Sequence, residues 1–511
     1  MPDASRVTAG VDRRVGWGGG PGLAGILVVA AVLRVAPWLR PHVFLGVQEY
    51  DDGVYYGAAR LLLHGQLPYR DVTIVHPPGA GLLMAPFAAL GQLVGDPAGL
   101  AAARVLVVVV ALANALLVAR LASGWAGRRA GLVAAACYAV LPTAVGAEHT
   151  VLLEPFVTVC CLGAVVLLTE GDTARRRAAA GALLAAAVSI KLFGAAYLLA
   201  VVPWLVLRRR ARDLLALGAG FVAGLTVLVL PFVLPAPGAF WHDVVVTQLS
   251  RPADATVSGV ARAVDLVGLR PVSVPVGLLL LVALCGAGVH RWRAAPREQG
   301  PGARVGAGLW LAVLGISGLA FLLSASYFQH YGEFVAPAVA VLVAWALTGG
   351  QPGRWRSPLL GLTLAAFALG AVVGDLRTQG QSDLRRLGRS VPAGRCVFAE
   401  TASLAIAADL LRPPSPACPG WVDGRGVIYT QSTGWPRGVS FYNAGFTSNA
   451  RWQAAVVDQL SHASFLLLSR PAGSVPEWSA TTRTYAVTHF RPVLVLPARG
   501  RGAAELWRRT G

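Results

Sequence analysis

Acidic residues gather in one polar stretch near the N-terminus of a chain that is otherwise poor in them. Glu49, Asp51 and Asp52 fall within four residues, although the 511 residues include only 25 Asp and Glu. Neighbouring carboxylates repel each other, so they indicate either a shared cation or an acid held for proton transfer. The alternative is that Asp51 or Asp52 only caps a helix over Val54–Leu63.

A few residues elsewhere could take part in the same chemistry. Lys191 is the only lysine among the 44 Lys and Arg residues, and it ends an apolar run, where a charge is costly unless it meets an anion or reaches the lipid surface. Glu154, followed by Pro155, and His330, followed by Tyr331, each precede an apolar run. We expect both to lie near a substrate, and Glu154 has the equal alternative of starting a helix.

Histidines could add a metal site to these carboxylates. His76, His149 and His330 are suitable ligands for a divalent ion together with Asp or Glu. Their spacing fits no compact metal motif. We therefore predict no cofactor, and a divalent metal stays an open alternative.

The composition indicates the environment in which these residues work. Hydrophobic residues make up 55% of the chain and charged residues only 14%, well below the ~25% of an average soluble domain. The 59 Gly and 33 Pro follow no three-residue period, and the 14 Trp and 16 Phe are too many for a solvated coil. The sequence therefore predicts an integral membrane protein.

The formal net charge of +19 does not indicate a nucleic-acid partner. The arginines form short clusters between apolar runs and no single basic face, as is typical of membrane proteins whose basic loops stay in the cytoplasm. The excess of Arg over Lys and the abundance of Ala, Gly and Pro suggest a bacterial source and hence the plasma membrane. The clusters are Arg128–Arg129, Arg175–Arg177, Arg208–Arg212, Arg291–Arg297 and Arg354–Arg356.

About eleven apolar runs could cross a bilayer core about 30 Å thick. They alternate consistently if every arginine cluster is cytoplasmic, together with the N-terminal Arg6, Arg13 and Arg14. The first run has no cleavage site and is predicted to be a retained anchor. The runs are Gly22–Leu39, Leu100–Ala122, Ala130–Ala147, Val151–Leu168, Ala178–Ile190, Leu192–Leu207, Leu214–Leu234, Val272–Val289, Val305–Ser324, Phe334–Leu347 and Leu359–Val373.

A weaker run, Gly79–Val94, is predicted to lie on the outer leaflet, because crossing there would put the later arginine clusters outside. The first outer loop, about residues 40–97, then carries the acids. A second outer loop, Ala236–Arg270, carries Arg251 against the general arginine bias. A lipid phosphate would explain this arginine, and contact with bilayer headgroups is the alternative.

From about residue 376 to 511 the chain becomes polar and is predicted to form a small extracytoplasmic α/β domain. Apolar stretches at Arg395–Ala399, Ser464–Ser469 and Pro492–Pro497 indicate buried strands, and helices are expected at Ala402–Leu411 and Ala450–Leu460. Cys396 and Cys418 lie in this part and could pair in an oxidising compartment.

The first outer loop resembles that of polyprenyl-phosphate-sugar-dependent membrane glycosyltransferases of the GT-C fold. This group includes protein O-mannosyltransferases and the aminoarabinose transferases of lipid A. The resemblance rests on Asp51-Asp52 after the first span, on Tyr55 with Ala58-Ala59-Arg60, and on His76-Pro77-Pro78. It covers the layout of residues 1–375 and the motif of residues 50–79.

The resemblance implies a role for several residues. One of Asp51 and Asp52 would be the base that deprotonates the acceptor hydroxyl, with Asp52 slightly favoured. His76 would lie near the lipid phosphate, where Lys191 and Arg251 could also bind. Tyr55, Glu154 and His330 would contact substrate.

The sequence thus predicts a multi-pass membrane glycosyltransferase. It would move a sugar, a mannose or a pentose by family, from a polyprenyl-phosphate donor to an envelope glycan, lipid or protein, with inversion at the anomeric carbon. The alternative is a non-enzymatic transporter or flippase of lipid-linked glycans, whose ionisable residues usually lie near the bilayer midplane in repeated halves. A scaffold whose outer domain binds wall glycan would leave the acidic pair unexplained.

Overall fold

The structure is a computed structural model of the whole chain. It describes residues 20–207, 211–253, 257–270, 273–299, 302–349, 354–432, 434–436, 439–441, 444–497 and 504–510.

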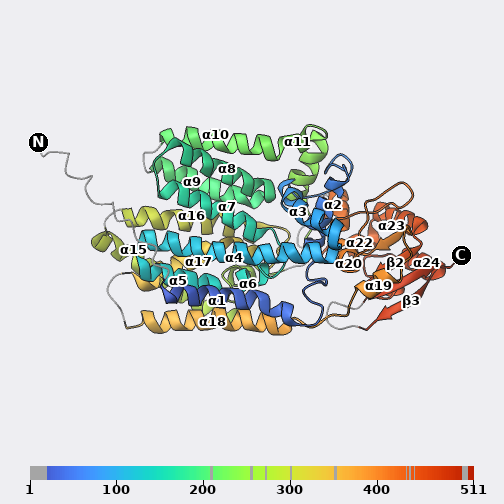
Figure 1. Cartoon of the computed structure of the whole chain (residues 1–511). Helices are drawn as coiled ribbons and strands as arrows, with labels where there is room; N and C mark the ends of the chain where they lie inside the picture. The colour runs from blue at the N-terminus through green and yellow to red at the C-terminus, as the bar shows by residue number, and fades with distance from the viewer. Residues whose placement is uncertain are drawn as a thin grey trace, which may run out of the picture.

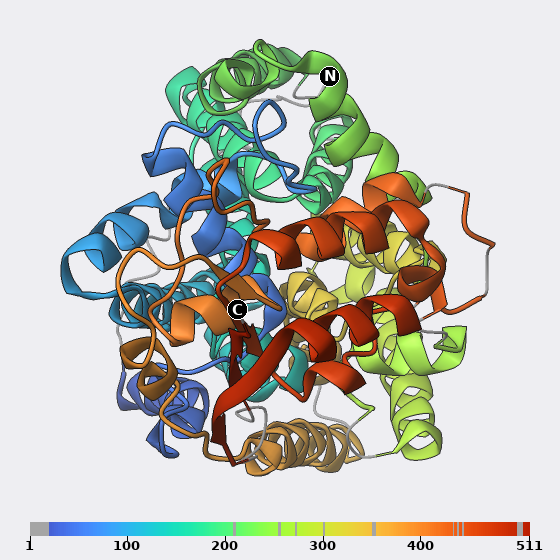
Figure 2. The same cartoon turned by 90° about the vertical axis from the view of Figure 1, so that its right-hand side faces the viewer.

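A bundle of long helices forms one part of the molecule, and a small domain with a sheet covers one end of it (Figure 1). Seen from that end, the C-terminal elements lie across the helices (Figure 2). The long helices are α1 (Pro21–Val35), α4 (Asp96–Ala126), α5 (Arg128–Val140), α7 (Glu154–Thr169), α8 (Ala174–Ile190), α9 (Ala195–Leu207), α10 (Ala211–Leu228), α15 (Val274–Gln299), α16 (Gly302–Leu323), α17 (Tyr331–Thr348) and α18 (Arg356–Arg377).

Shorter helices connect the long ones. Two of them, α2 (Tyr50–Leu63) and α3 (Gly79–Val94), pack on each other at the end that carries the C-terminal domain. The others are η2 (Ala36–Leu39), α6 (Pro142–Ala147), η3 (Leu192–Gly194), α11 (Leu230–Val233), α12 (Pro237–Phe240), the π-helix η4 (Trp241–Val246), α13 (Thr247–Ser250) and α14 (Gly259–Leu266).

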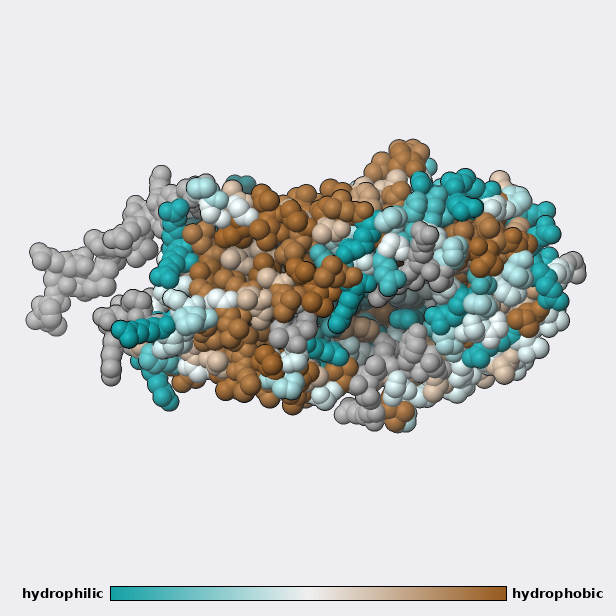
Figure 3. Space-filling model, turned by 90° about the horizontal axis from the view of Figure 1, so that it is seen from below, coloured by the Kyte–Doolittle hydropathy of each residue, from teal (hydrophilic) through white to brown (hydrophobic). Residues whose placement is uncertain are grey.

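Helices lie at each of the eleven predicted spans. Among the described residues, six helical segments are long and apolar enough to cross a membrane. Apolar residues form a broad band on the face of the molecule shown in Figure 3. The polytopic helical fold is therefore confirmed, while the number of eleven spans stays a prediction. The predicted cytoplasmic Arg6, Arg13 and Arg14 lie outside the described residues. The six segments are Pro21–Leu39, Asp96–Ala126, Val274–Ala294, Gly306–Leu323, Tyr331–Thr348 and Arg356–Arg377.

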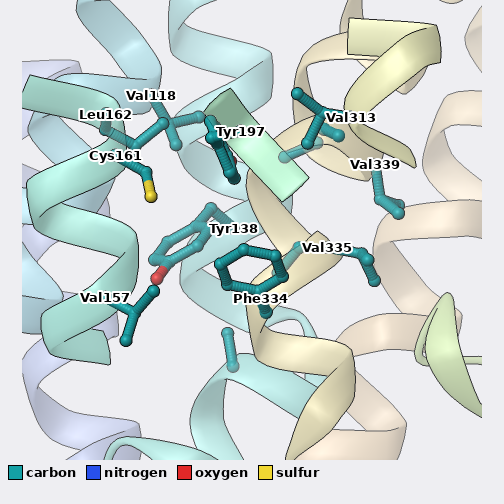
Figure 4. Packing of buried hydrophobic residues seen from close by; sticks show 14 of the residues in the cluster. Val118, Tyr138, Val157, Cys161, Leu162, Tyr197, Val313, Phe334, Val335 and Val339 are labelled. Carbon is teal, nitrogen blue, oxygen red and sulfur yellow. The ribbon is translucent and has the colours of Figure 1, made fainter. Parts of the chain in front are cut away.

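Helix α17 is the centre of the bundle. Of an 18-residue stretch of it, 89% is buried, against 17% for Pro21–Leu39 at the edge. Its Phe334, Val335 and Val339 pack among side chains from α4, α5, α7, α9 and α16, with the rings of Tyr138 and Tyr197 nearest to Phe334 in the close-up (Figure 4). This buried centre begins at Tyr331, directly after His330, so it fixes one side of the end of the bundle that carries the C-terminal domain.

The C-terminal domain contains one four-stranded sheet in the order β1-β2-β4-β3. Strand β1 (Val397–Ala399) runs parallel to β2 (Phe465–Leu468), whereas β4 (Ala504–Arg509) is antiparallel to both β2 and β3 (Phe490–Leu496). The three predicted strands are present, and β4 was not predicted because its charged residues hide the apolar alternation. The domain limits at residues 375 and 376 stay a prediction.

Helices surround this sheet. Two of them, α20 (Ala402–Ala407) and α23 (Ala450–His462), lie where helices were predicted. A disulfide joins Cys396 to Cys418, with 5.3 Å between their Cα atoms, which answers the question that the sequence left open. The helices that the sequence analysis did not predict are α19 (Arg385–Arg389), α21 (Gly424–Gln431), α22 (Ala444–Ser448), η5 (Ala472–Ser474) and α24 (Ala480–His489).

Candidate active site

The two neighbouring acids at the start of α2 face different surroundings. Asp52 is fully buried, and its Oδ2 accepts hydrogen bonds from Arg104 Nη2 and Thr150 Oγ1, each at 2.8 Å. Arg104 also donates to the carbonyl oxygens of Phe44 at 2.6 Å and Gly46 at 2.9 Å. Asp52 therefore fastens the first outer loop to α4.

Asp51, one residue earlier, is only half-buried, and its Oδ2 accepts a hydrogen bond from the Tyr55 hydroxyl at 3.2 Å. Burial by itself would raise the pKa of the Asp51 carboxyl. Interactions with His330, His76, Lys191 and Arg251 outweigh burial and lower this pKa below its usual value. Asp51 is therefore an ionised acid at neutral pH, surrounded by the predicted phosphate-binding residues.

Lys191 is held between a carboxylate and two aromatic rings. Its Nζ donates to Glu154 Oε1 at 2.5 Å and lies 5.0 Å from the ring centre of Tyr331 and 5.5 Å from that of Phe193. His330 Nε2 is 3.7 Å from the same Glu154 oxygen. The ends of α7, α8 and α17 thus bring three predicted site residues together.

His76 reaches this place on the loop before α3. Its ring meets that of Tyr55 edge-on at 5.1 Å. A side chain at Gly79 would come within 2.4 Å of the Ser189 carbonyl oxygen, so the loop lies directly on the end of α8, next to Lys191. Burial, together with the charge of Lys191, lowers the pKa of His76 to about 3. His76 is therefore neutral and can donate one hydrogen bond, but it supplies no charge.

Arg251 lies between two aromatic rings from different parts of the molecule. Its guanidinium carbon is 5.4 Å from the ring centre of Phe328, before α17, and 4.4 Å from that of Tyr429, on α21. Stacking of this kind stabilises a cation and fixes the plane of its donors. The C-terminal domain therefore takes part in the site.

A second contact with α21 was missed by the sequence analysis. The Tyr50 hydroxyl donates to Asp423 Oδ1 at 3.2 Å and accepts from the Arg425 backbone N–H at 3.0 Å. Asp423 also caps α21, because the same oxygen accepts from the Gly426 N–H at 2.7 Å. Burial, reinforced by the charge of Asp51, raises the pKa of Asp423 to about 6. The sequence signals only a helix cap here, not the contact with Tyr50.

A further buried network lies deeper in the bundle. Arg34 pairs with Glu148, and the Tyr138 hydroxyl lies 2.6 Å from Glu148 Oε1 and 2.9 Å from Glu333 Oε1. Thr158 Oγ1 donates to Glu333 Oε2 at 2.9 Å. The side chains of Glu148 and Glu333 are fully enclosed and join α1, α5, α7 and α17.

Two arginines inside predicted membrane spans could have been used to predict buried ion pairs. Arg104 interrupts the run Leu100–Ala122, and Arg34 interrupts Gly22–Leu39. A charge within a span almost always has a partner, which could have indicated Asp52 and Glu148 as pairing acids. Within the described part of the chain, no group of three or more His, Cys, Asp or Glu side chains is arranged to hold a metal ion.

Comparisons with known proteins agree with this architecture. The sequence profile of glycosyltransferase family 87 matches residues 75–325. The structure is similar to that of ArnT from Cupriavidus metallidurans bound to undecaprenyl phosphate, with a TM-score of 0.61 and 16% identity over 95% of this chain and 97% of that one. The chain has the GT-C fold. The recognition made from the first outer loop is thereby confirmed.

Two other proteins share the GT-C fold with this chain. The oligosaccharyltransferase of Archaeoglobus fulgidus matches with a TM-score of 0.57 and 13% identity over 95% of this chain and 74% of that one. The arabinofuranosyltransferase AftD from Mycobacteria matches with a TM-score of 0.52 and 15% identity over 96% of this chain and 40% of AftD. No curated protein matches the sequence significantly. The family profile and the fold together support a membrane glycosyltransferase.

Proposed function

We propose that this protein moves a sugar from a polyprenyl-phosphate donor to an acceptor hydroxyl on the outer face of a bacterial plasma membrane. One observation carries the proposal: Asp51 is an ionised, half-buried acid in the same site as Lys191 and Arg251. A base and cations in one place are what displacement of a phosphate leaving group requires.

Asp51, rather than the initially favoured Asp52, is the proposed base. A general base must come within hydrogen-bond reach of the acceptor hydroxyl. Asp52 has no exposed surface and is paired with Arg104, so an acceptor could reach it only by disrupting that pair. Asp51 is partly exposed, and its hydrogen bond from Tyr55 fixes the orientation of its carboxylate.

The proposed phosphate site consists of Lys191 and Arg251, with His76 as a neutral donor. The solved ArnT structure contains undecaprenyl phosphate, which makes the same chemical class the first candidate here. Glu154 and His330 were expected to contact substrate. Their contacts favour another role, because both face Lys191 and can hold its ammonium group in place.

The transfer would be a single displacement. The acceptor O–H gives its proton to Asp51, the acceptor oxygen bonds to the anomeric carbon, and the bond from that carbon to the phosphate oxygen breaks. The electron pair of the broken bond stays on polyprenyl phosphate, whose added charge Lys191 and Arg251 stabilise. One displacement inverts the anomeric centre.

The test uses the purified full chain with undecaprenyl-phosphate-linked mannose and arabinose. We expect release of undecaprenyl phosphate from one of these donors, and loss of that release in the Asp51→Asn variant. Asp71→Asn is the matched control, because Asp71 lies on the same loop but is exposed and paired with Arg70. Release that Asp51→Asn leaves intact would contradict the proposal, and protected uptake of the lipid-sugar into vesicles without release would favour a flippase.

A further inference from the structure

Helix α21 of the C-terminal domain contacts both sides of the proposed reaction. At its start, Asp423 and the Arg425 backbone hold Tyr50, the residue next to the proposed base. One turn later, Tyr429 covers the guanidinium of Arg251, one of the two proposed phosphate-binding cations. A single short helix therefore contacts both Tyr50, next to the proposed base, and Arg251, the proposed phosphate-binding cation.

The contact with Tyr50 restrains Asp51 from one side. The Tyr50 hydroxyl both donates to α21 and accepts from it, and the Arg425 guanidinium carbon lies 4.6 Å from the ring centre of Tyr50. On the other side of Asp51, Asp52 is fixed by Arg104 and Thr150. The backbone that carries Asp51 is thus anchored at the residue before it and at the residue after it.

The contact with Arg251 is reinforced by its own chain neighbours. The Phe441 N–H of the C-terminal domain donates to the Ala253 carbonyl oxygen at 2.6 Å. Ser326 Oγ, in the turn before α17, donates to the Pro252 carbonyl oxygen at 2.9 Å. The segment after Arg251 is therefore held between the buried centre of the bundle and the C-terminal domain.

Helix α2 packs closely on the C-terminal domain at two glycines. A side chain at Gly53 would come 2.2 Å from the Ser403 backbone nitrogen, and one at Gly57 would come 2.4 Å from Val422 Cγ1. Glycine at these two positions lets the helix lie directly on the neighbouring domain. A small displacement of α21 would consequently move Tyr50 and Arg251 as well.

We propose that Tyr50 and Tyr429 are positioning residues for sugar transfer, through which α21 sets the placement of Asp51 relative to Arg251. The inference rests on the proposed function and goes beyond it, because it makes the C-terminal domain a working part of the active site. Misplacing a reacting group by about 1 Å can cost about 100-fold in rate, so such supports matter although they touch no substrate.

The test separates the two contacts by kinetics. Tyr50→Phe removes the hydroxyl but keeps the ring, and we expect kcat for release of undecaprenyl phosphate to fall about 10-fold or more with KM for the donor unchanged. Tyr429→Leu removes the aromatic face, and we expect binding of undecaprenyl phosphate to weaken about 5-fold or more, whereas Tyr429→Phe keeps the wild-type value.

Tyr485→Leu is the control, because Tyr485 is another tyrosine of the C-terminal domain, half-buried, that lies on α24 and stacks on His489. Its kinetics should equal those of the wild type. Wild-type kcat in Tyr50→Phe together with wild-type binding in Tyr429→Leu would overturn the inference. So would an equal loss in Tyr429→Phe and Tyr429→Leu. If Asp51→Asn keeps its activity in the same assay, the proposed function itself has failed.

Discussion

Two ionic clusters begin at adjacent residues of α2 and differ in their exposure to solvent. The cluster around Asp52 is closed: Arg104 and the acid have no exposed side-chain surface, and Arg104 donates to two loop carbonyls as well. The cluster around Asp51 is open, since the acid is partly exposed and its neighbours His330, His76, Lys191 and Arg251 come from four separate segments. One residue of the chain therefore separates a structural ion pair from a proposed reacting acid.

The largest expected effect comes from the open cluster. Asp51→Asn should reduce release of undecaprenyl phosphate by about 10²–10⁴-fold, the usual contribution of a general base. The temperature of unfolding should stay near that of the wild type, because Asp51 forms no buried ion pair with any residue that the structure describes. A variant that loses stability and activity together would make Asp51 a structural residue like Asp52.

Breaking the ion pair of the closed cluster should lower the folding stability of the protein. Arg104→Ala leaves the Asp52 carboxylate buried without its cation, and such a loss costs about 3–5 kcal/mol. Denaturation of the purified protein should reveal this cost, and any remaining folded fraction should keep the wild-type KM for the donor. A changed KM with unchanged stability would assign Arg104 to the substrate.

A smaller effect is expected from Lys191, at the edge of the open cluster. Lys191→Gln should weaken binding of undecaprenyl phosphate by about 10–100-fold, since hydrogen bonds to charged groups contribute about 1.5–3 kcal/mol. The double variant with Glu154→Gln is the control, because it leaves no unpaired carboxylate. If the double variant regains binding, Lys191 serves only to neutralise Glu154.

The smallest effect is on pH dependence. The pKa of Asp423 is about 6, and the groups that face it are Tyr50, Asp51, Arg251 and the backbone N–H of Gly426. Above pH 6 the ionised Asp423 adds negative charge and makes Asp51 a stronger base, so kcat should rise about twofold to threefold between pH 5 and pH 7. Asp423→Asn should remove this rise, and an unchanged profile would exclude Asp423 as its source.

Much of the fold could be predicted because bilayer thickness fixes the length of apolar runs. The first outer loop could be recognised from the acids and from His76-Pro77-Pro78. Three-dimensional pairing could not be predicted: the partner of Asp52 is 52 residues away, and the partner of Tyr50 is 373 residues away. The direction in which each of two adjacent acids points depends on those partners, which explains why the sequence slightly favoured the other one.

The most direct test of the central claim is the labelling of intact cells with a membrane-impermeant thiol reagent. We expect an Asp51→Cys variant to react from outside, undecaprenyl phosphate to slow this reaction in the purified protein, and an Asp52→Cys variant to stay unlabelled. Reaction of the Asp51→Cys variant only after permeabilisation, or equal labelling of both variants, would contradict this claim.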